Sequence, residues 1–264
     1  MKKKHSRQNH RPGTGRQPAD FSERTYRRRI GVAGLKRFHV VCQETDLMVQ
    51  ADQVLETQTR EQVLVCRGHI EGYIQRYPTF ATTLLPWQGE TFAPPVVWQM
   101  IQAGQAAGVG PMASVAGAIA ENVGRHLLGQ CRQIVVENGG DLFLKTDETV
   151  VIGLFAGDSP LSMNVGIKIP PSENGVGVCT SSGTVGHSLS AGSADAVCVV
   201  SPSCALADAA ATAIGNRIHT PRDIKDAIDF GKTITGVNGI VVVVNREMGG
   251  WGEIELVPLN GKKG

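Results

Sequence analysis

Residues 204–214 read Cys-Ala-Leu-Ala-Asp-Ala-Ala-Ala-Thr-Ala-Ile, an apolar run in which only Asp208 and Thr212 are polar. Ser203 supplies a helix start just before it and Gly215 a helix stop just after it, so the pattern predicts an Ala-rich helix. Asp208 and Thr212 are four residues apart and therefore share one face of that helix.

Strands and helices surround this segment without a strict βαβ alternation. That mixture favours an α+β fold in which mixed β-sheets pack together and helices lie outside. We expect residues 19–264 to form one domain of two intimately packed halves that meet near residue 108. Strands are expected at 38–42, 46–51, 134–136, 142–144, 149–155, 163–169, 176–180, 196–200, 240–245 and 253–257. The last two of these strands are expected to form a hairpin about Gly249-Gly250. Helices are expected at 59–77, from Pro94-Pro95 onward, and at 112–128, 203–214 and 220–230.

The composition excludes several classes of protein. The chain has 264 residues, of which 41% are hydrophobic, enough for a sizeable core. Residues 1–29 hold ten Lys or Arg against two acids, which leaves a net charge of −6 on the remainder. We therefore expect residues 1–18 to be a disordered basic tail and nucleic acid not to be the partner.

No run of eighteen apolar residues exists, no apolar stretch follows the basic start, and the six cysteines show no CxxC pairing. These features predict a cytoplasmic protein with reduced cysteines, buried as small apolar residues, and without a membrane span.

A buried carboxylate on the apolar helix requires compensation. Leaving Asp208 unpaired in the interior would cost several kcal/mol or shift its pKa. A carboxylate and a hydroxyl on one face suit Mg²⁺, whose remaining ligands a phosphate can supply. Two simpler explanations are that Asp208 pairs with an Arg, or that this turn of the helix faces solvent.

Two further segments have the composition of a ligand site. Asn138-Gly139-Gly140-Asp141 lies between two short strands, where its glycines permit positive φ and close approach of a ligand; it also fits an ordinary hairpin turn. The loop at 180–187 contains Ser182-Gly183 and His187, whose hydroxyl, N–H and imidazole groups suit an anion. Its alternative is a plain Ser/Gly loop with an exposed histidine.

The order of these segments resembles the catalytic half of the ApbE family over roughly residues 108–216. The family's Gly-Gly-Asp turn, Ser-Gly loop and histidine resemble the segments just described, and its A-D-x-x-x-T pattern matches Ala207-Asp208 and Thr212. The stretch 116–121 resembles the family's K-G-x-x-x-D pattern, with Ala116 in place of the Lys and Glu121 in place of the Asp. The family's D-P-x-T-G segment has no counterpart here.

The resemblance implies a Mg²⁺ site and an FAD pocket with the metal on the pyrophosphate. Family members cleave FAD to FMN and AMP, or transfer FMN onto a threonine of an acceptor protein. A non-catalytic nucleotide-binding protein and a structural or homo-oligomeric one remain alternatives. The implied site assigns catalysis to His187 and Asp141, cofactor binding to Glu121, Asn138, Gly139, Gly140, Ser182 and Gly183, and metal ligation to Asp208, Thr212 and Ala116.

Overall fold

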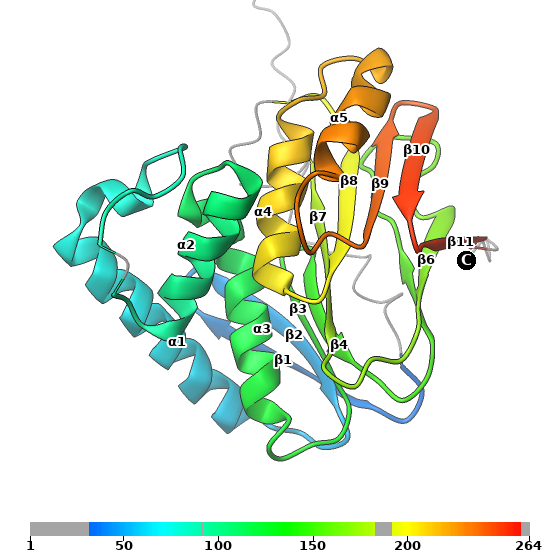
Figure 1. The fold of residues 1–264 in the computed structure, drawn as a ribbon. Helices are drawn as coiled ribbons and strands as arrows, with labels where there is room; N and C mark the ends of the chain where they lie inside the picture. Colours follow the sequence, from blue (N-terminus) through cyan, green and yellow to red (C-terminus); the bar gives the residue numbers. More distant parts are fainter. Residues whose placement is uncertain (1–31, 91, 183–191, 260–264) are drawn as a thin grey trace, which may run out of the picture.

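An eight-stranded sheet separates the helices from a smaller sheet in the computed structural model, which describes residues 32–90, 92–182 and 192–259 (Figure 1). The strand order of the large sheet is β1-β2-β3-β4-β7-β8-β9-β10, and every neighbouring pair is antiparallel. Its strands are β1 Lys36–Cys42, β2 Thr45–Ala51, β3 Ile134–Asn138, β4 Asp141–Lys145, β7 Val176–Ser181, β8 Ala196–Ser201, β9 Gly239–Val244 and β10 Glu247–Gly252.

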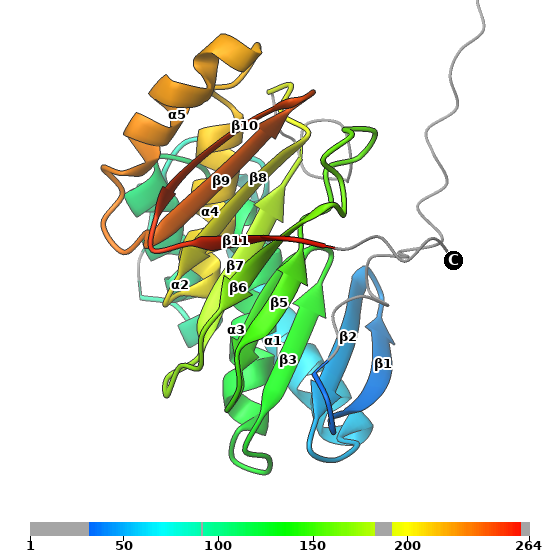
Figure 2. The same ribbon diagram turned by 90° about the vertical axis from the view of Figure 1, so that its right-hand side faces the viewer.

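The second sheet has the order β11-β6-β5 and covers one face of the first (Figure 2). Its strands are β5 Val150–Gly153, β6 Val165–Ile169 and β11 Glu255–Pro258. Because side chains alternate along a strand, one set from the large sheet, including Leu142 and Val178, packs with Ile152 and Ile167 into a core between the two sheets.

The opposite face of the large sheet carries the helices α1 Glu56–Arg76, α2 Pro95–Ala107, α3 Val115–Leu127, α4 Cys204–Gly215 and α5 Ile224–Gly231, with 3₁₀ turns at Pro78–Ala81, Pro111–Ser114 and Pro221–Asp223. The Ala-rich α4 packs on β7 and β8 and is flanked by α2 and α3 (Figure 1). Its alanine side chains, such as Ala209 and Ala210, are fully buried. Small side chains let a helix approach its neighbours on several sides, so α4 lies at the centre of the helical layer.

The predicted α+β architecture, with sheets packed together and helices outside, is confirmed. The predicted pairing at the C-terminal end of the chain is wrong. The partner of β9 is β10, which contains Gly249-Gly250 within the strand, and Glu255–Pro258 instead pairs with β6 in the small sheet. The turn falls earlier because Asn245 adopts the left-handed conformation, with a φ of 56°, which asparagine tolerates well.

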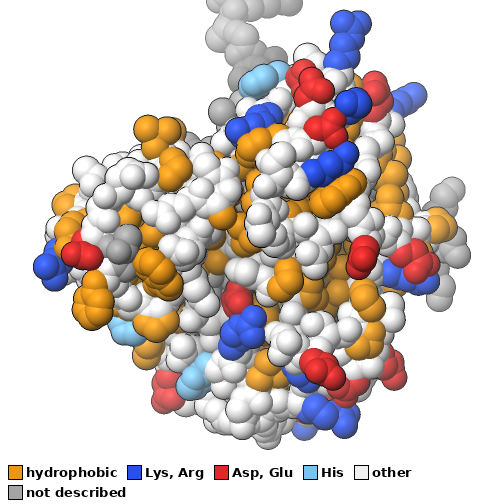
Figure 3. Space-filling model, in the orientation of Figure 1, with side chains coloured by type: hydrophobic (Ala, Val, Ile, Leu, Met, Phe, Trp, Pro, Cys, Tyr) orange, Lys and Arg blue, Asp and Glu red, His pale blue; other side chains and the backbone are white. Residues whose placement is uncertain are grey.

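The surface shows two local concentrations of side chains (Figure 3). Charges of both signs gather over α5, where Asp229 forms ion pairs with Lys225 (2.8 Å) and Lys232 (2.6 Å). Apolar side chains such as Leu85 and Phe92 are exposed between α1 and α2. Within the described ranges, no helix combines the length and apolarity needed to cross a membrane, and all six cysteines are free thiols.

Candidate functional site

Asp208 lies where α4 crosses the first turn of α3. Its Oδ2 accepts a hydrogen bond from the backbone N–H of Gly117 at 2.9 Å. The helices approach closely because residue 117 has no side chain: a Cβ there would lie 2.9 Å from the Cβ of Asp208 and collide with the carbonyl oxygen of Cys204. Thr212 follows one turn later on α4 and is buried, whereas Asp208 is half-buried.

The turn between β3 and β4 brings Asp141 to the same end of the sheet. Gly139 and Gly140 have φ values of 66° and 110°, conformations that glycine adopts without steric cost. Asn138 and Asp141 face each other across this turn, and the Nδ2 of Asn138 donates to the carbonyl oxygen of Ala116 at 3.1 Å. The segment is therefore a hairpin turn that also contacts α3.

Asp141 and Asp208 share a poorly solvated space. Burial, and then the negative charge of Asp208, raise the pKa of the buried Asp141 well above its ordinary value. Burial raises the pKa of Asp208 to about 7, against hydrogen bonds from the Gly117 and Ala116 backbone that lower it. Among the described residues, neither carboxylate forms an ion pair with Lys, Arg or His, so pairing of Asp208 with an Arg does not explain its burial there.

The end of β7 supplies thiol and hydroxyl groups to the helical side of the sheet. Cys179 lies opposite Asp141 in the strand register, and a hydrogen bond with the Cys179 side chain acts to lower the pKa of Asp141. Two residues on, the Ser181 hydroxyl is buried and has no hydrogen-bond partner within the described part of the chain. Ser182 follows it, whereas Gly183 and His187 lie outside the described residues.

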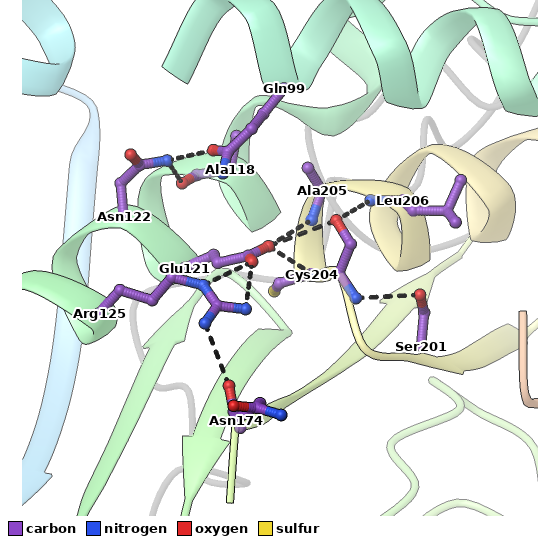
Figure 4. A network of polar contacts seen from close by, with 12 residues as sticks. Gln99, Ala118, Glu121, Asn122, Arg125, Asn174, Ser201, Cys204, Ala205 and Leu206 are labelled. Atoms are coloured by element: carbon purple, nitrogen blue, oxygen red, sulfur yellow. Dashed lines mark hydrogen bonds and ion pairs between the residues drawn. The ribbon is translucent and has the colours of Figure 1, made fainter. Parts of the chain in front are cut away.

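Glu121 connects α3 to the N-terminus of α4 (Figure 4). Its Oε2 accepts hydrogen bonds from the backbone N–H of Cys204 at 2.7 Å and of Ala205 at 3.4 Å, and its Oε1 forms an ion pair with Arg125 at 2.8 Å. A carboxylate at this position also complements the positive end of the α4 dipole. Both oxygens are engaged by the protein, so Glu121 fixes the two helices that position Asp208.

The donor groups at this site fit a hard divalent cation. Within the described ranges, no three His, Cys, Asp or Glu side chains form a metal cluster, so Asp141 and Asp208 would need further oxygen ligands. The carbonyl oxygen of Ala116 and the hydroxyl of Thr212 are nearby candidates along α3 and α4. Carboxylates completed by carbonyl, hydroxyl, water and phosphate oxygens are what Mg²⁺ prefers.

Sequence reasoning missed the contribution of α1. A pocket of about 330 Å³ adjoins Ala116 and Asn138, and its walls include Arg67, Ile70 and Ile74 from α1. The sequence predicts only a helix over 59–77 here, from the helical spacing of its apolar residues. No local signal indicates that this helix lines a pocket.

The chain is similar in sequence to one family of proteins and to two uncharacterised relatives. A sequence profile of the family described as "AbpE bacteria" matches residues 28–248. A "UPF0280 protein" of Methanococcus aeolicus is 42% identical over 224 residues, covering 83% of this chain and 90% of its own, and one of Methanocella arvoryzae is 42% identical over 215 residues, covering 81% and 87%.

Two solved structures share the fold. The flavinyl transferase ApbE of Pseudomonas stutzeri, in its apo form, superposes with a TM-score of 0.54 at 12% identity, covering 82% of this chain and 93% of its own. The flavin transferase ApbE of Vibrio cholerae gives the same TM-score and identity, covering 82% and 97%.

Proposed function

The chain belongs to the family described as AbpE bacteria, and from that premise we propose that it binds FAD through a divalent cation held by Asp141 and Asp208. We further propose that it acts on the FAD pyrophosphate, either hydrolysing it with one water to FMN and AMP or transferring the FMN part to a hydroxyl group of an acceptor protein with release of AMP. The similarity to the solved ApbE structures shows that the fold is shared. The proposed chemistry is inferred from the residues described below.

One observation carries the proposal: the buried Asp141 and the half-buried Asp208 share a site without a basic partner in the described chain. Burial raises the pKa of both carboxyl groups, and the negative charge of Asp208 raises the pKa of Asp141 further, as expected for two carboxylates that share a poorly solvated site. A purely structural pair of ionised carboxylates would be destabilising, because the hydrogen bonds to Asp141 and Asp208 offset only part of the cost of removing their charges from water. A divalent cation held by Asp141 and Asp208 would offset that cost and would supply positive charge for an anionic ligand.

The surrounding residues have distinct roles in this proposal. The Gly117 N–H fixes the orientation of the Asp208 carboxylate, and Asn138 fixes the Ala116 carbonyl. Glu121 holds α4 against α3. A bound cation would withdraw charge from the phosphoryl oxygens and orient the bond to be broken. Ser182, Gly183 and His187 remain candidates for contacts with the phosphates or the acceptor.

Incubation with FAD and MgCl₂, followed by chromatography, tests the proposal. We expect FMN and AMP in equal amounts and no product in EDTA. Asp208→Asn should lower the rate at least about a hundredfold, which is the typical effect of removing a group that stabilises charge in the transition state. Asp158→Asn, which removes an exposed carboxylate elsewhere, should retain the wild-type rate. If FAD neither turns over nor shifts the melting temperature in Mg²⁺, the proposal is wrong.

A second candidate is binding of the dinucleotide without turnover. It is favoured by Ala116, which stands where the resembled family has Lys, and by the absence of a basic partner for Asp141 and Asp208 among the described residues. This alternative predicts Mg²⁺-dependent stabilisation by FAD with no FMN formed, even after addition of a cell extract as the source of acceptor protein.

A further inference from the structure

We infer that β10, at one edge of the large sheet, pairs with β10 of a second copy of this chain across a two-fold axis at Gly250. No described strand lies on the outer side of β10, which runs beside α5 (Figure 1). Glu247 pairs with Val244 next to a two-residue turn, the position at which the strands of a hairpin bond to each other. Because bonded and unbonded residues alternate along an antiparallel strand, Met248 and Gly250 direct their N–H and C=O groups outward.

The two edges of the large sheet differ in how they are protected. β1, at the opposite edge, carries the exposed Lys36 and Arg37. The Arg60 guanidinium also donates to the Val41 carbonyl oxygen there, at 3.0 Å. Charged side chains of this kind keep an edge strand from pairing with another chain. β10 has one charged residue, Glu247 at its first position, and no proline, so its edge is open to a further strand.

The sequence of β10 is complementary to itself about Gly250. Its last five residues read Met-Gly-Gly-Trp-Gly. When two such strands run antiparallel with Gly250 on the two-fold axis, Met248 lies opposite the partner's Gly252. Trp251 then lies opposite the partner's Gly249. Each large side chain therefore meets a position without one on the same face of the sheet, and an aromatic side chain across from a glycine covers the backbone exposed there.

A pocket beside Gly249 can receive the partner's Trp251. It has a volume of about 370 Å³ and lies between α5 and β10, with Ile224 and Ile228 of α5 among its walls. The helix approaches so closely because Gly249 has no side chain: a Cβ there would lie 2.5 Å from Ile224. In one copy of the chain Trp251 is half-buried and Met248 is 41% exposed. Pairing would remove part of this apolar surface from water, which favours association.

The charges around this edge do not oppose a second copy. Asp229 at the rim of the pocket forms ion pairs with Lys225 at 2.8 Å and Lys232 at 2.6 Å. β10 ends at Gly252, where a φ of 95° turns the chain away. In the inferred register Glu247 therefore has no residue of the partner strand opposite it, and like charges do not face each other along the two strands.

Sedimentation velocity of the full chain tests the inference. We expect a wild-type species of twice the chain mass of 28.1 kDa, in equilibrium with the monomer. Gly250 is exposed, and a Cβ there would contact only the Ile240 carbonyl oxygen, at 3.6 Å, so a single copy accepts a side chain at this position. Gly250→Glu and Gly250→Lys each place two like charges across the axis and should weaken self-association at least about tenfold. The control is Gly72→Glu, at an exposed position of α1 with nothing within 4 Å.

Mixing the two variants tests the position of the axis. Gly250→Glu and Gly250→Lys in equal amounts should form a dimer with one copy of each, because opposite charges then face each other; native mass spectrometry identifies it by its mass. Melting temperatures equal to that of Gly72→Glu establish that both variants are folded. A monomeric wild type, self-association of Gly250→Glu as strong as that of Gly72→Glu, or no mixed dimer would overturn the inference. None of these outcomes depends on FAD, so the inference stands or falls separately from the proposed function.

Discussion

Asp208→Asn should stabilise the metal-free protein while removing its response to Mg²⁺. Burial raises the pKa of Asp208 from 3.8 in the unfolded chain to about 7 in the folded protein. Between these values the folded state retains a proton that the unfolded state has lost, so the stability of the wild type falls as the pH rises through this window. Asparagine resembles the protonated acid and does not incur that loss.

The size of the effect follows from the shift. A difference of roughly three pH units corresponds to about 4 kcal/mol in the free energy of unfolding at pH 8. The remaining exposure of Asp208, which is half-buried, makes this an upper limit. At pH 4, close to the unfolded pKa, the difference should fall below about 1 kcal/mol.

Urea denaturation in EDTA at pH 8 and pH 4 measures both values, with Asp158→Asn as the control for an exposed carboxylate. Adding Mg²⁺ at a hundred times its Kd should then raise the stability of the wild type by about 2.7 kcal/mol and leave Asp208→Asn unchanged. A variant less stable than wild type at pH 8 in EDTA would show that Asp208 is compensated in the folded protein by a group other than a metal ion.

Three further predictions concern the packing around the site. Gly117→Ala should destabilise the protein by about 2 kcal/mol or more, because the new Cβ would collide with the Cys204 carbonyl oxygen. The control is Gly72→Ala on α1, where nothing lies within 4 Å of the new Cβ, and this change should stabilise the protein by up to about 1 kcal/mol. Equal stability of the two variants in urea would contradict the close contact between α3 and α4. Glu121→Gln should cost about 1–3 kcal/mol by urea denaturation, since a charge-assisted bond to the Cys204 N–H is weakened; an unchanged midpoint would exclude that contact. Burial raises the pKa of Cys204 to about 11, so this thiol should react with Ellman's reagent at pH 8 only after unfolding, and rapid labelling of its peptide in native protein, read by mass spectrometry, would contradict its burial.

Much of the fold follows from local pattern. Alternating or continuous apolar runs bounded by turns predicted most strands of the large sheet, and the Ala-rich helix was expected at 203–214 and is found at Cys204–Gly215. The last strand, expected at 253–257 and found at Glu255–Pro258, was predicted to form a hairpin with β9 about Gly249-Gly250. Its pairing with β6, about ninety residues away, depends on packing between the two sheets, which no local signal reports.

The candidate site likewise combines features that the local sequence predicts with long-range contacts that it does not predict. The four-residue spacing of Asp208 and Thr212 and the Gly-Gly turn are local features, and they were visible in the sequence. The contacts that assemble the site join residues distant in the chain: Gly117 with Asp208, and Asn138 with Ala116. Glu121 shows the limit most clearly. Its place in a motif suggested cofactor binding, which stays a prediction, but no signal in the sequence indicated its hydrogen bonds with the N-terminus of α4.

The central claim is that Asp141 and Asp208 together hold one divalent cation. Titration of the protein with Mn²⁺, followed by electron paramagnetic resonance of the free ion, measures this directly, with and without FAD. We predict one bound ion per chain in the wild type, held more tightly with FAD, and a loss of at least about tenfold in affinity in both Asp141→Asn and Asp208→Asn. Equal Mn²⁺ binding by wild type and both variants, or no binding by the wild type even with FAD, would contradict the claim.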